Sequence, residues 1–318
     1  MPKSRRCLVA NGWTGGLTSG HDMSSGTQHL ASGADFVPTL RSDTYDYIKP
    51  EQFDLKDRAV LITGASKGIG RETAFSFAKA GASKIAIAAR SSLDSLKPEI
   101  ETAAKNAGRS VPQIVVLKLD VADYDSAAAA AKEVEQTFGR LDILINNAGF
   151  LEPFKRLLDS DPKDWRMSVE TNLIGSYNVT RAFLGLMLKS PNGLKEILML
   201  SSIGGNLVLP LGSAYGPCKL ALQRFSEIIC ADYPEVLAFS IHPGGVLTEL
   251  AKRMGKEMEG LLTDTPQLAA DAMVWLTAER REWLQGRYVS VTWDAKELVE
   301  KRKKIEEEDL LLVKLRVD

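Results

Sequence analysis

Cysteine is scarce in this chain of 318 residues, and the three present, Cys7, Cys218 and Cys230, form no C-x-x-C pair. This count fits neither a disulfide framework nor a zinc site and predicts a reducing, cytoplasmic compartment with no metal cofactor. No apolar run approaches the roughly 18 residues of a membrane-spanning helix, so no membrane span is expected. An excess of basic charge is also missing, since 40 Lys and Arg face 41 Asp and Glu. This balance argues against a nucleic-acid partner.

The N-terminal region lacks apolar periodicity. Residues 1–34 hold six glycines among many Ser and Thr, a composition that cannot bury enough surface to fold. We therefore predict a flexible extension over residues 1–52, disordered over 1–34, with the Phe- and Tyr-containing stretch 36–53 able to lie against the core as an extended arm. The basic start, Lys3-Ser4-Arg5-Arg6, leaves a transit peptide open as an alternative.

Short aliphatic runs then alternate with helical patterns through the rest of the chain. Strands are predicted at 59–63, 84–89, 114–119, 141–146, 196–201, 236–241 and 287–292. Helices are predicted at 70–80, 126–138, 162–189, 215–231 and 266–277. Nearly continuous apolar strands are typical of parallel sheets covered on both faces. The fold class is therefore α/β, a Rossmann-like, doubly wound, parallel seven-stranded sheet, in a domain spanning 53–294 and followed by a charged helical extension, 295–318.

The first strand–turn–helix carries a glycine pattern. Gly64, Gly68 and Gly70 are spaced G-x-x-x-G-x-G between the first strand and the first helix. Glycines at such a turn allow close backbone approach, and the helix N-terminus favours a pyrophosphate. The second strand ends in Arg90-Ser91, where a carboxylate would select NAD. Arg90 and Lys67 instead predict NADP(H) as cofactor, the alternative being two solvated surface cations.

Three further motifs complete the pattern. Asn146-Asn147-Ala148-Gly149 closes the fourth strand, and Ser202 follows the fifth. Tyr215 and Lys219 lie four residues apart and therefore share one helix face. Over about residues 58–292 this combination resembles the single-domain branch of the short-chain dehydrogenase/reductase family. The C-terminal stretch is similar to that of fungal members, many of which act in secondary metabolism.

The resemblance implies a set of site residues. It implies catalytic roles for Asn172, Ser202, Tyr215 and Lys219. It implies cofactor contacts by Gly64, Ser66, Lys67, Gly68, Ile69, Gly70, Arg90, Ser91, Asp120, Val121, Asn146, Ala148, Gly149, Tyr215, Lys219, Pro243, Gly244, Val246 and Thr248. The activity implied is an NADP(H)-dependent oxidoreductase, a ketoreductase that interconverts a ketone and a secondary alcohol with Tyr215 as general acid/base. The alternative is an NADP(H)-binding sensor or scaffold without turnover.

The substrate pocket is less well defined by the sequence. Candidate walls are Phe150, Phe154, Ile203, Leu209 and Met254, which suit a hydrophobic small molecule, although the same residues could be core packing. Trp293-Asp294 stands where the family has a glycine pair. This departure and the C-terminal extension put the family's usual tetramer in doubt. A homodimer through the helices around 162–189 and 215–231 is expected.

Overall fold

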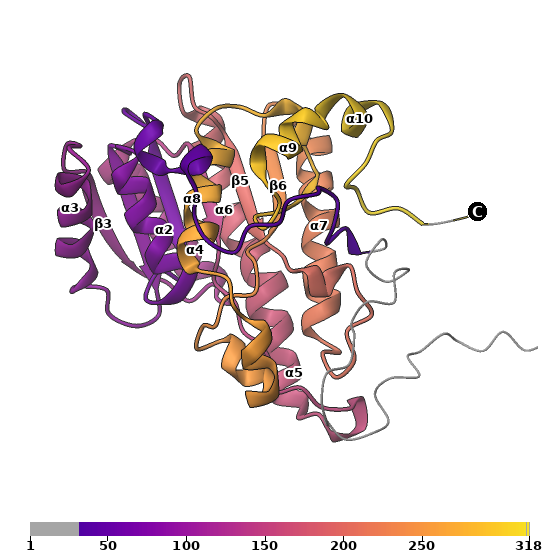
Figure 1. Ribbon diagram of the computed structural model, residues 1–318. Coiled ribbons are helices and arrows are strands. Elements are labelled where there is room, and N and C mark those ends of the chain that lie inside the picture. Colours follow the sequence, from indigo (N-terminus) through magenta and orange to yellow (C-terminus); the bar gives the residue numbers. More distant parts are fainter. Residues whose placement is uncertain (1–31, 316, 318) are drawn as a thin grey trace, which may run out of the picture.

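Seven parallel strands form one sheet in the computed structural model, which describes residues 32–315 and residue 317 (Figure 1). The spatial order is β3-β2-β1-β4-β5-β6-β7, so the order reverses between β1 and β4. The strands are β1 Ala59–Thr63, β2 Lys84–Ala89, β3 Gln113–Lys118, β4 Ile143–Asn146, β5 Glu196–Leu200, β6 Leu237–His242 and β7 Tyr288–Ser290. This arrangement confirms the predicted Rossmann-like sheet.

Helices cover both faces of the sheet. One face packs on α2 (Gly68–Lys79), α3 (Leu96–Asn106) and α8 (Pro266–Thr277), the other on α4 (Tyr124–Phe138), α6 (Gly175–Lys189) and α7 (Tyr215–Asp232). Strand side chains alternate between the two cores: Val60 and Ile62 enter the first, and Leu61 enters the second. Because both cores are apolar, all five residues of β1 are buried. No helix in the described part is long and apolar enough to cross a membrane.

The helix predicted over 162–189 is divided. It consists of α5 (Pro162–Val169), a π-helical turn η4 (Glu170–Ile174) and α6. Within the turn, the Asn172 side chain donates to the carbonyls of Ser168 at 2.8 Å and Phe150 at 2.6 Å. The change from α-helix to π-helix thus occurs where the Asn172 side chain bonds one residue of its own helix and one residue of another segment. Helix α3 was not predicted.

The C-terminal extension is less helical than predicted. Helices α9 (Ala295–Glu300) and α10 (Arg302–Glu307) are followed by irregular chain, in which Asp309 and Leu311 have positive φ angles. Non-glycine residues in that conformation cannot continue a right-handed helix. The extension also packs on the domain, because Leu298 and Ile305 are buried in the core.

The described part of the predicted flexible extension, residues 32–52, is packed against the domain. Val37 and Ile48 are buried, and the Trp293 indole donates to the carbonyl of Gly33 at 3.0 Å. Arg41 forms an ion pair with Asp294 at 2.7 Å. This arm crosses beside α8 and the C-terminal extension (Figure 1), and its bounds include two short helices, η1 (Asp46–Ile48) and η2 (Pro50–Gln52). Of residues 1–34, which were predicted to be disordered, residues 32–34 belong to this packed arm, and residues 1–31 lie outside the described residues.

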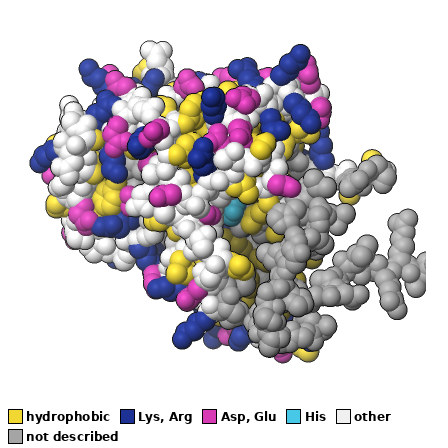
Figure 2. Space-filling model, viewed as in Figure 1, with side chains coloured by type: hydrophobic (Ala, Val, Ile, Leu, Met, Phe, Trp, Pro, Cys, Tyr) yellow, Lys and Arg dark blue, Asp and Glu magenta, His cyan; other side chains and the backbone are white. Residues whose placement is uncertain are grey.

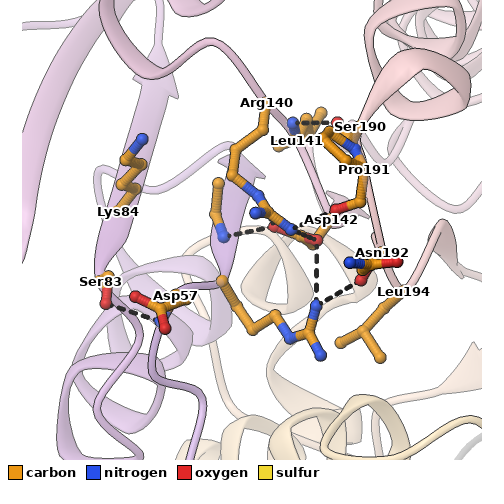
Figure 3. A network of polar contacts seen from close by, with 12 residues as sticks. Asp57, Ser83, Lys84, Arg140, Leu141, Asp142, Ser190, Pro191, Asn192 and Leu194 are labelled. Atoms are coloured by element: carbon orange, nitrogen blue, oxygen red, sulfur yellow. Dashed lines mark hydrogen bonds and ion pairs between the residues drawn. The ribbon is translucent and has the colours of Figure 1, made fainter.

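A buried carboxylate, that of Asp142, connects the amino ends of neighbouring strands. Asp142 is fully buried and accepts hydrogen bonds from the Ala59 backbone N–H at 2.8 Å and from Arg140 at 2.6 and 2.9 Å (Figure 3). Arg58 approaches the same carboxylate at 3.6 Å and donates to the carbonyl of Asn192. The network joins β1, β4 and the loop before β5 at the amino ends of the strands. The predicted site residues lie at the opposite, carboxyl ends of the strands.

Candidate active site

The glycine turn lies between β1 and α2 and is packed closely against the end of β4. Gly64 and Gly68 have positive φ angles of 65° and 58°. A Cβ atom on Gly70 would lie 2.4 Å from Asn147 Nδ2 and 2.5 Å from the Gly64 oxygen. Glycine is therefore required at these positions both by backbone conformation and by the neighbouring loop.

The two asparagines that close β4 have different partners. Asn147 Nδ2 donates to the carbonyls of Thr63 at 2.7 Å and Gly64 at 3.1 Å, which ties the turn to β4. Asn146, the residue singled out from the sequence, donates instead to Thr180 Oγ1 on α6 and is buried. The side chain that holds the glycine turn is thus Asn147. No role was predicted for it from the sequence, and the only sequence signal for it was its position next to Asn146.

The first turn of α2 has no capping side chain. Its N-cap residue, Lys67, makes no side-chain cap bond, so the leading N–H groups of this helix are not satisfied by a capping side chain. Thr248 faces the same turn, since a Cβ atom on Gly68 would lie 3.1 Å from Thr248 Cγ2. Ser66 and Ile69 are half-buried here, and Lys67 is exposed.

The other predicted cofactor residues follow the carboxyl ends of neighbouring strands. Parallel strands present these ends at one edge of the sheet, where α/β folds bind their ligands. The residues are Arg90 and Ser91 after β2, Asp120 and Val121 after β3, Ala148 and Gly149 after β4, and Pro243, Gly244 and Val246 after β6. Arg90 and Ser91 are exposed, while Val121 and Val246 are buried. The predicted cofactor residues therefore lie at the end of the sheet where α/β folds bind their ligands.

Ser202, Tyr215 and Lys219 meet at the end of β5. The Tyr215 phenol hydrogen-bonds the Ser202 side chain, whose Oγ also accepts from the Gly204 N–H at 3.1 Å. Lys219 Nζ lies 5.2 Å from the centre of the Tyr215 ring and donates to the Leu200 carbonyl at 2.7 Å. Helix α7 begins at Tyr215 and brings both side chains onto one face, as their four-residue spacing predicts.

Burial shifts the pKa of both titratable groups on this face. It raises the pKa of Tyr215 to about 12, against the lowering effect of the Ser202 hydrogen bond. It lowers the pKa of Lys219 to about 8. Burial disfavours the charged form of each side chain, which explains the opposite directions. Tyr215 is therefore a protonated phenol at neutral pH.

Asn172 is fully buried and connects η4 to the loop after β4. Its amide donates to the Phe150 carbonyl and to Ser168, and its Oδ1 accepts from the Phe150 N–H at 3.4 Å. Gly149 allows this approach, since a Cβ atom there would lie 3.1 Å from Asn172 Oδ1. The side chain thus holds the loop that carries Phe150.

Two of the predicted substrate-wall residues lie together, and a third lies beneath a cation. Phe154 and Leu209 both lie beside Gly212. A Cβ atom on Gly212 would lie 3.5 Å from Phe154 Cε1 and 3.1 Å from Leu209 Cδ2. The Arg253 guanidinium lies over the Phe150 ring, 4.5 Å from its centre, and approaches Asp164 at 3.9 Å. Ile203 and Met254 are half-buried in η5 (Ile203–Gly205) and η6 (Ala251–Met254). A cation beside the wall was not anticipated from the sequence.

Comparisons with known proteins identify the family of this chain. The sequence profile of the short chain dehydrogenase family matches residues 58–259. The chain is 47% identical over 287 residues to short chain dehydrogenase mpl6 of Monascus purpureus, covering 90% of this chain and 98% of that protein.

Solved structures are similar as well. An alcohol dehydrogenase from the archaeon Thermococcus sibiricus, complexed with 5-hydroxy-NADP, is 28% identical with a TM-score of 0.62, covering 73% of this chain and 95% of that one. A protein described as a short chain dehydrogenase from Shigella flexneri, complexed with NADP, is 25% identical with a TM-score of 0.66, covering 76% and 99%. This chain belongs to the short chain dehydrogenase family and is an oxidoreductase that uses a nicotinamide cofactor.

Proposed function

We propose that this oxidoreductase interconverts a ketone and a secondary alcohol on a hydrophobic small molecule, with NADP(H) as cofactor. The observation that carries the proposal is the placement of Ser202, Tyr215 and Lys219 at one end of the sheet. A hydroxyl, a phenol and an ammonium so placed can bind a carbonyl oxygen and deliver a proton to it. The bound cofactor would supply a hydride to the carbonyl carbon, or accept one from the carbinol carbon.

Tyr215 is the proposed acid in ketone reduction. Its phenol is protonated at neutral pH, because burial raises its pKa to about 12. Ser202 donates a hydrogen bond to the substrate oxygen, and the Tyr215 O–H bond breaks as the proton passes to that oxygen. The phenolate left behind is stabilised by the nearby Lys219 ammonium and recovers a proton from solvent. In alcohol oxidation the same groups act in reverse, with the phenolate as base.

Asn172 is proposed as a positioning residue. Its side chain hydrogen-bonds Phe150 and Ser168. These bonds fix the loop of the substrate wall relative to η4. Its role is thus to hold Phe150 in place.

NADP(H) is proposed over NAD(H) because of the charge at the end of β2. Arg90 is exposed there, and Lys67 is exposed at the glycine turn, so both side chains are accessible to a phosphate group. No carboxylate stands between β2 and Asp94, and Ser92 hydrogen-bonds Asp94 at 2.8 Å. Cation–phosphate bonds of this kind favour the 2′-phosphate of NADP.

A homodimer is proposed through the outer faces of α6 and α7. Large apolar side chains are exposed on these helices, namely Tyr177, Leu220 and Ile228. The ring of Tyr177 on α6 packs near that of Phe225 on α7, with 6.3 Å between the ring centres. A contiguous apolar face on two helices is typical of a subunit interface. Sedimentation equilibrium tests this proposal, and a single species of monomer mass at micromolar concentration would contradict it.

The activity is tested with NADPH and a panel of hydrophobic ketones. We expect oxidation of NADPH with one or more ketones and formation of the matching alcohol, with slower turnover of acidic or sugar substrates. Tight binding of NADPH without turnover of any ketone would contradict the proposal. That result would favour the alternative, a sensor or scaffold protein.

A further inference from the structure

Glu152 lies in the loop after β4 and is almost completely buried, with 3% of its surface exposed. Its Oε1 accepts hydrogen bonds from the backbone N–H groups of Ala214 at 3.0 Å and Tyr215 at 2.9 Å. The second oxygen, Oε2, is buried and makes no hydrogen bond within the described part of the chain. A buried carboxylate with one unpaired oxygen is costly, so its presence beside Tyr215 requires an explanation.

The carboxylate is attached to the proton donor itself. Helix α7 begins at Tyr215, and its N-cap residue, Ala214, has no side chain that could cap it. Glu152 supplies the missing acceptor from a different part of the chain, 63 residues away. Because it bonds the N–H of Tyr215, it fixes the backbone from which the phenol projects toward Ser202.

The charge of Glu152 acts in the same direction as burial. The titratable groups facing the Tyr215 phenol are Glu152 from the loop and Lys219 from α7, while Cys218 on α7 also faces Glu152. Glu152 raises the pKa of Tyr215, since a nearby carboxylate disfavours the phenolate. Lys219, whose Nζ lies 5.2 Å from the ring, has the opposite effect on a phenolate when it is protonated.

We propose that Glu152 is a positioning residue for Tyr215, which holds the first turn of α7 in place and sets a carboxylate beside the phenol. The inference rests on the proposed function, because it assumes that Tyr215 is the proton donor. The wild-type enzyme should retain reductase activity to higher pH than a variant that lacks the negative charge.

Two substitutions separate position from charge. Glu152→Gln keeps a side-chain oxygen for the two N–H groups and removes the charge, whereas Glu152→Ala removes both. We expect Glu152→Ala to lower kcat for ketone reduction by about 10- to 100-fold with little change in NADPH affinity. Glu152→Gln should recover most of this loss, and the alkaline decline of its reductase rate should move to lower pH by about half to one unit.

Glu196→Gln is a control for replacing a buried glutamate far from Tyr215. Because burial keeps Glu196 protonated, this variant controls for the substitution itself and not for the loss of a negative charge. Glu196 is also a fully buried glutamate whose oxygens make no hydrogen bond among the described residues, but it is the first residue of β5, at the end of the strand away from Tyr215. Its substitution should leave the pH profile of reduction unchanged. If Glu152→Gln and Glu152→Ala both keep the wild-type rate and profile, the proposal is wrong. It is also wrong if both lose activity without any shift of the pH profile in Glu152→Gln, since a purely structural role would then suffice.

A second readout does not depend on turnover. Tyrosine labelled with ¹³C at the ring carbon bearing oxygen gives an NMR signal that moves when the phenol ionises. With saturating oxidised cofactor bound, the signal of Tyr215 is the one missing from Tyr215→Phe. Its titration midpoint should fall in Glu152→Gln and stay unchanged in Glu196→Gln. An unchanged midpoint in Glu152→Gln would overturn the inference even if the proposed ketone activity fails.

Discussion

The two adjacent asparagines at the end of β4 have side chains that point in different directions. Asn146 is the last residue of the strand, and its side chain enters the core toward Thr180. Asn147 comes next and bonds the carbonyls of Thr63 and Gly64. Side chains alternate in direction along a strand, so adjacent asparagines must face opposite sides. The tight packing of the glycine turn therefore depends on Asn147 and on the glycines that make room for it.

Arg90 is the residue on which the cofactor preference depends most directly. Arg90→Ala should weaken NADPH binding by about ten- to a hundred-fold, because a charge-assisted hydrogen bond contributes roughly 1.5–3 kcal/mol. NADH, which lacks the 2′-phosphate, should bind almost as before. Fluorescence titration of both cofactors on wild type and variant measures the difference. Equal affinities of the wild-type enzyme for the two cofactors would contradict the assignment.

Among the structural elements, the arm and the C-terminal extension stabilise each other. The Thr39 N–H and hydroxyl both donate to Glu297, at 2.8 and 2.6 Å. Arg41 pairs with Asp294, and the Tyr45 hydroxyl accepts from the Ala295 N–H at 2.7 Å. Trp293, which stands where the family has a glycine pair, fills the space between them. Trp293, the residue that departs from the family pattern, thus anchors the arm.

Trp293→Phe tests this anchor. The variant keeps an aromatic ring but removes the indole N–H that donates to Gly33, so we expect a loss of about 1–2 kcal/mol in the free energy of unfolding. In a chain that begins at Val37, and so lacks Gly33 and Ala34, the same substitution should cost much less. Urea unfolding of the four proteins measures both costs. Equal costs in the two backgrounds would show that Trp293 does not hold the arm.

The sequence predicted the sheet and the shared helix face of Tyr215 and Lys219 because both depend on local patterns. The grouping of Ser202 with these two residues came from the resemblance to the family. Apolar runs locate strands, and a spacing of four locates two side chains on one helix face. The π-helical turn at Asn172 was not predictable, since it is accompanied by a bond to Phe150 in another segment. The same holds for Glu152, whose partners lie 62 and 63 residues away, and for Arg41, which is 253 residues from Asp294. Contacts between distant segments leave no periodic signal in the sequence.

For the molecule as a whole, the arm and the extension protect an exposed edge of the sheet. The Tyr288 N–H on the outer strand β7 donates to the Leu311 carbonyl at 2.8 Å, and the Arg41 N–H donates to the Thr292 carbonyl at 2.7 Å. An unpaired edge strand would invite association with another chain. Charged side chains of both signs are scattered over the face of the molecule shown in Figure 2. These features support a dimer through α6 and α7 rather than association through β7.

The stability of the whole domain should depend on pH through Glu196. Burial raises its pKa well above the usual value, so the folded protein retains a proton that the unfolded chain releases above about pH 4.3. The free energy of unfolding should therefore fall as pH rises from that value toward the raised pKa. Glu196→Gln carries no such proton, and its stability should fall less between about pH 5 and 8. Urea unfolding across this range measures both slopes, and parallel curves would contradict the assignment.

The central claim is that the Tyr215 phenol transfers the proton in a ketone/alcohol reaction. Tyr215→Phe removes one oxygen, so the fold and the affinity for NADPH should be preserved. Turnover should fall by about 10²–10⁴-fold, the usual contribution of a positioned acid or base. The most direct test is single-turnover kinetics of NADPH oxidation with a ketone substrate, with NADPH titration on the same preparations, because single turnovers exclude product release from the comparison. A Tyr215→Phe enzyme that binds NADPH normally and keeps most of the wild-type rate would contradict the account.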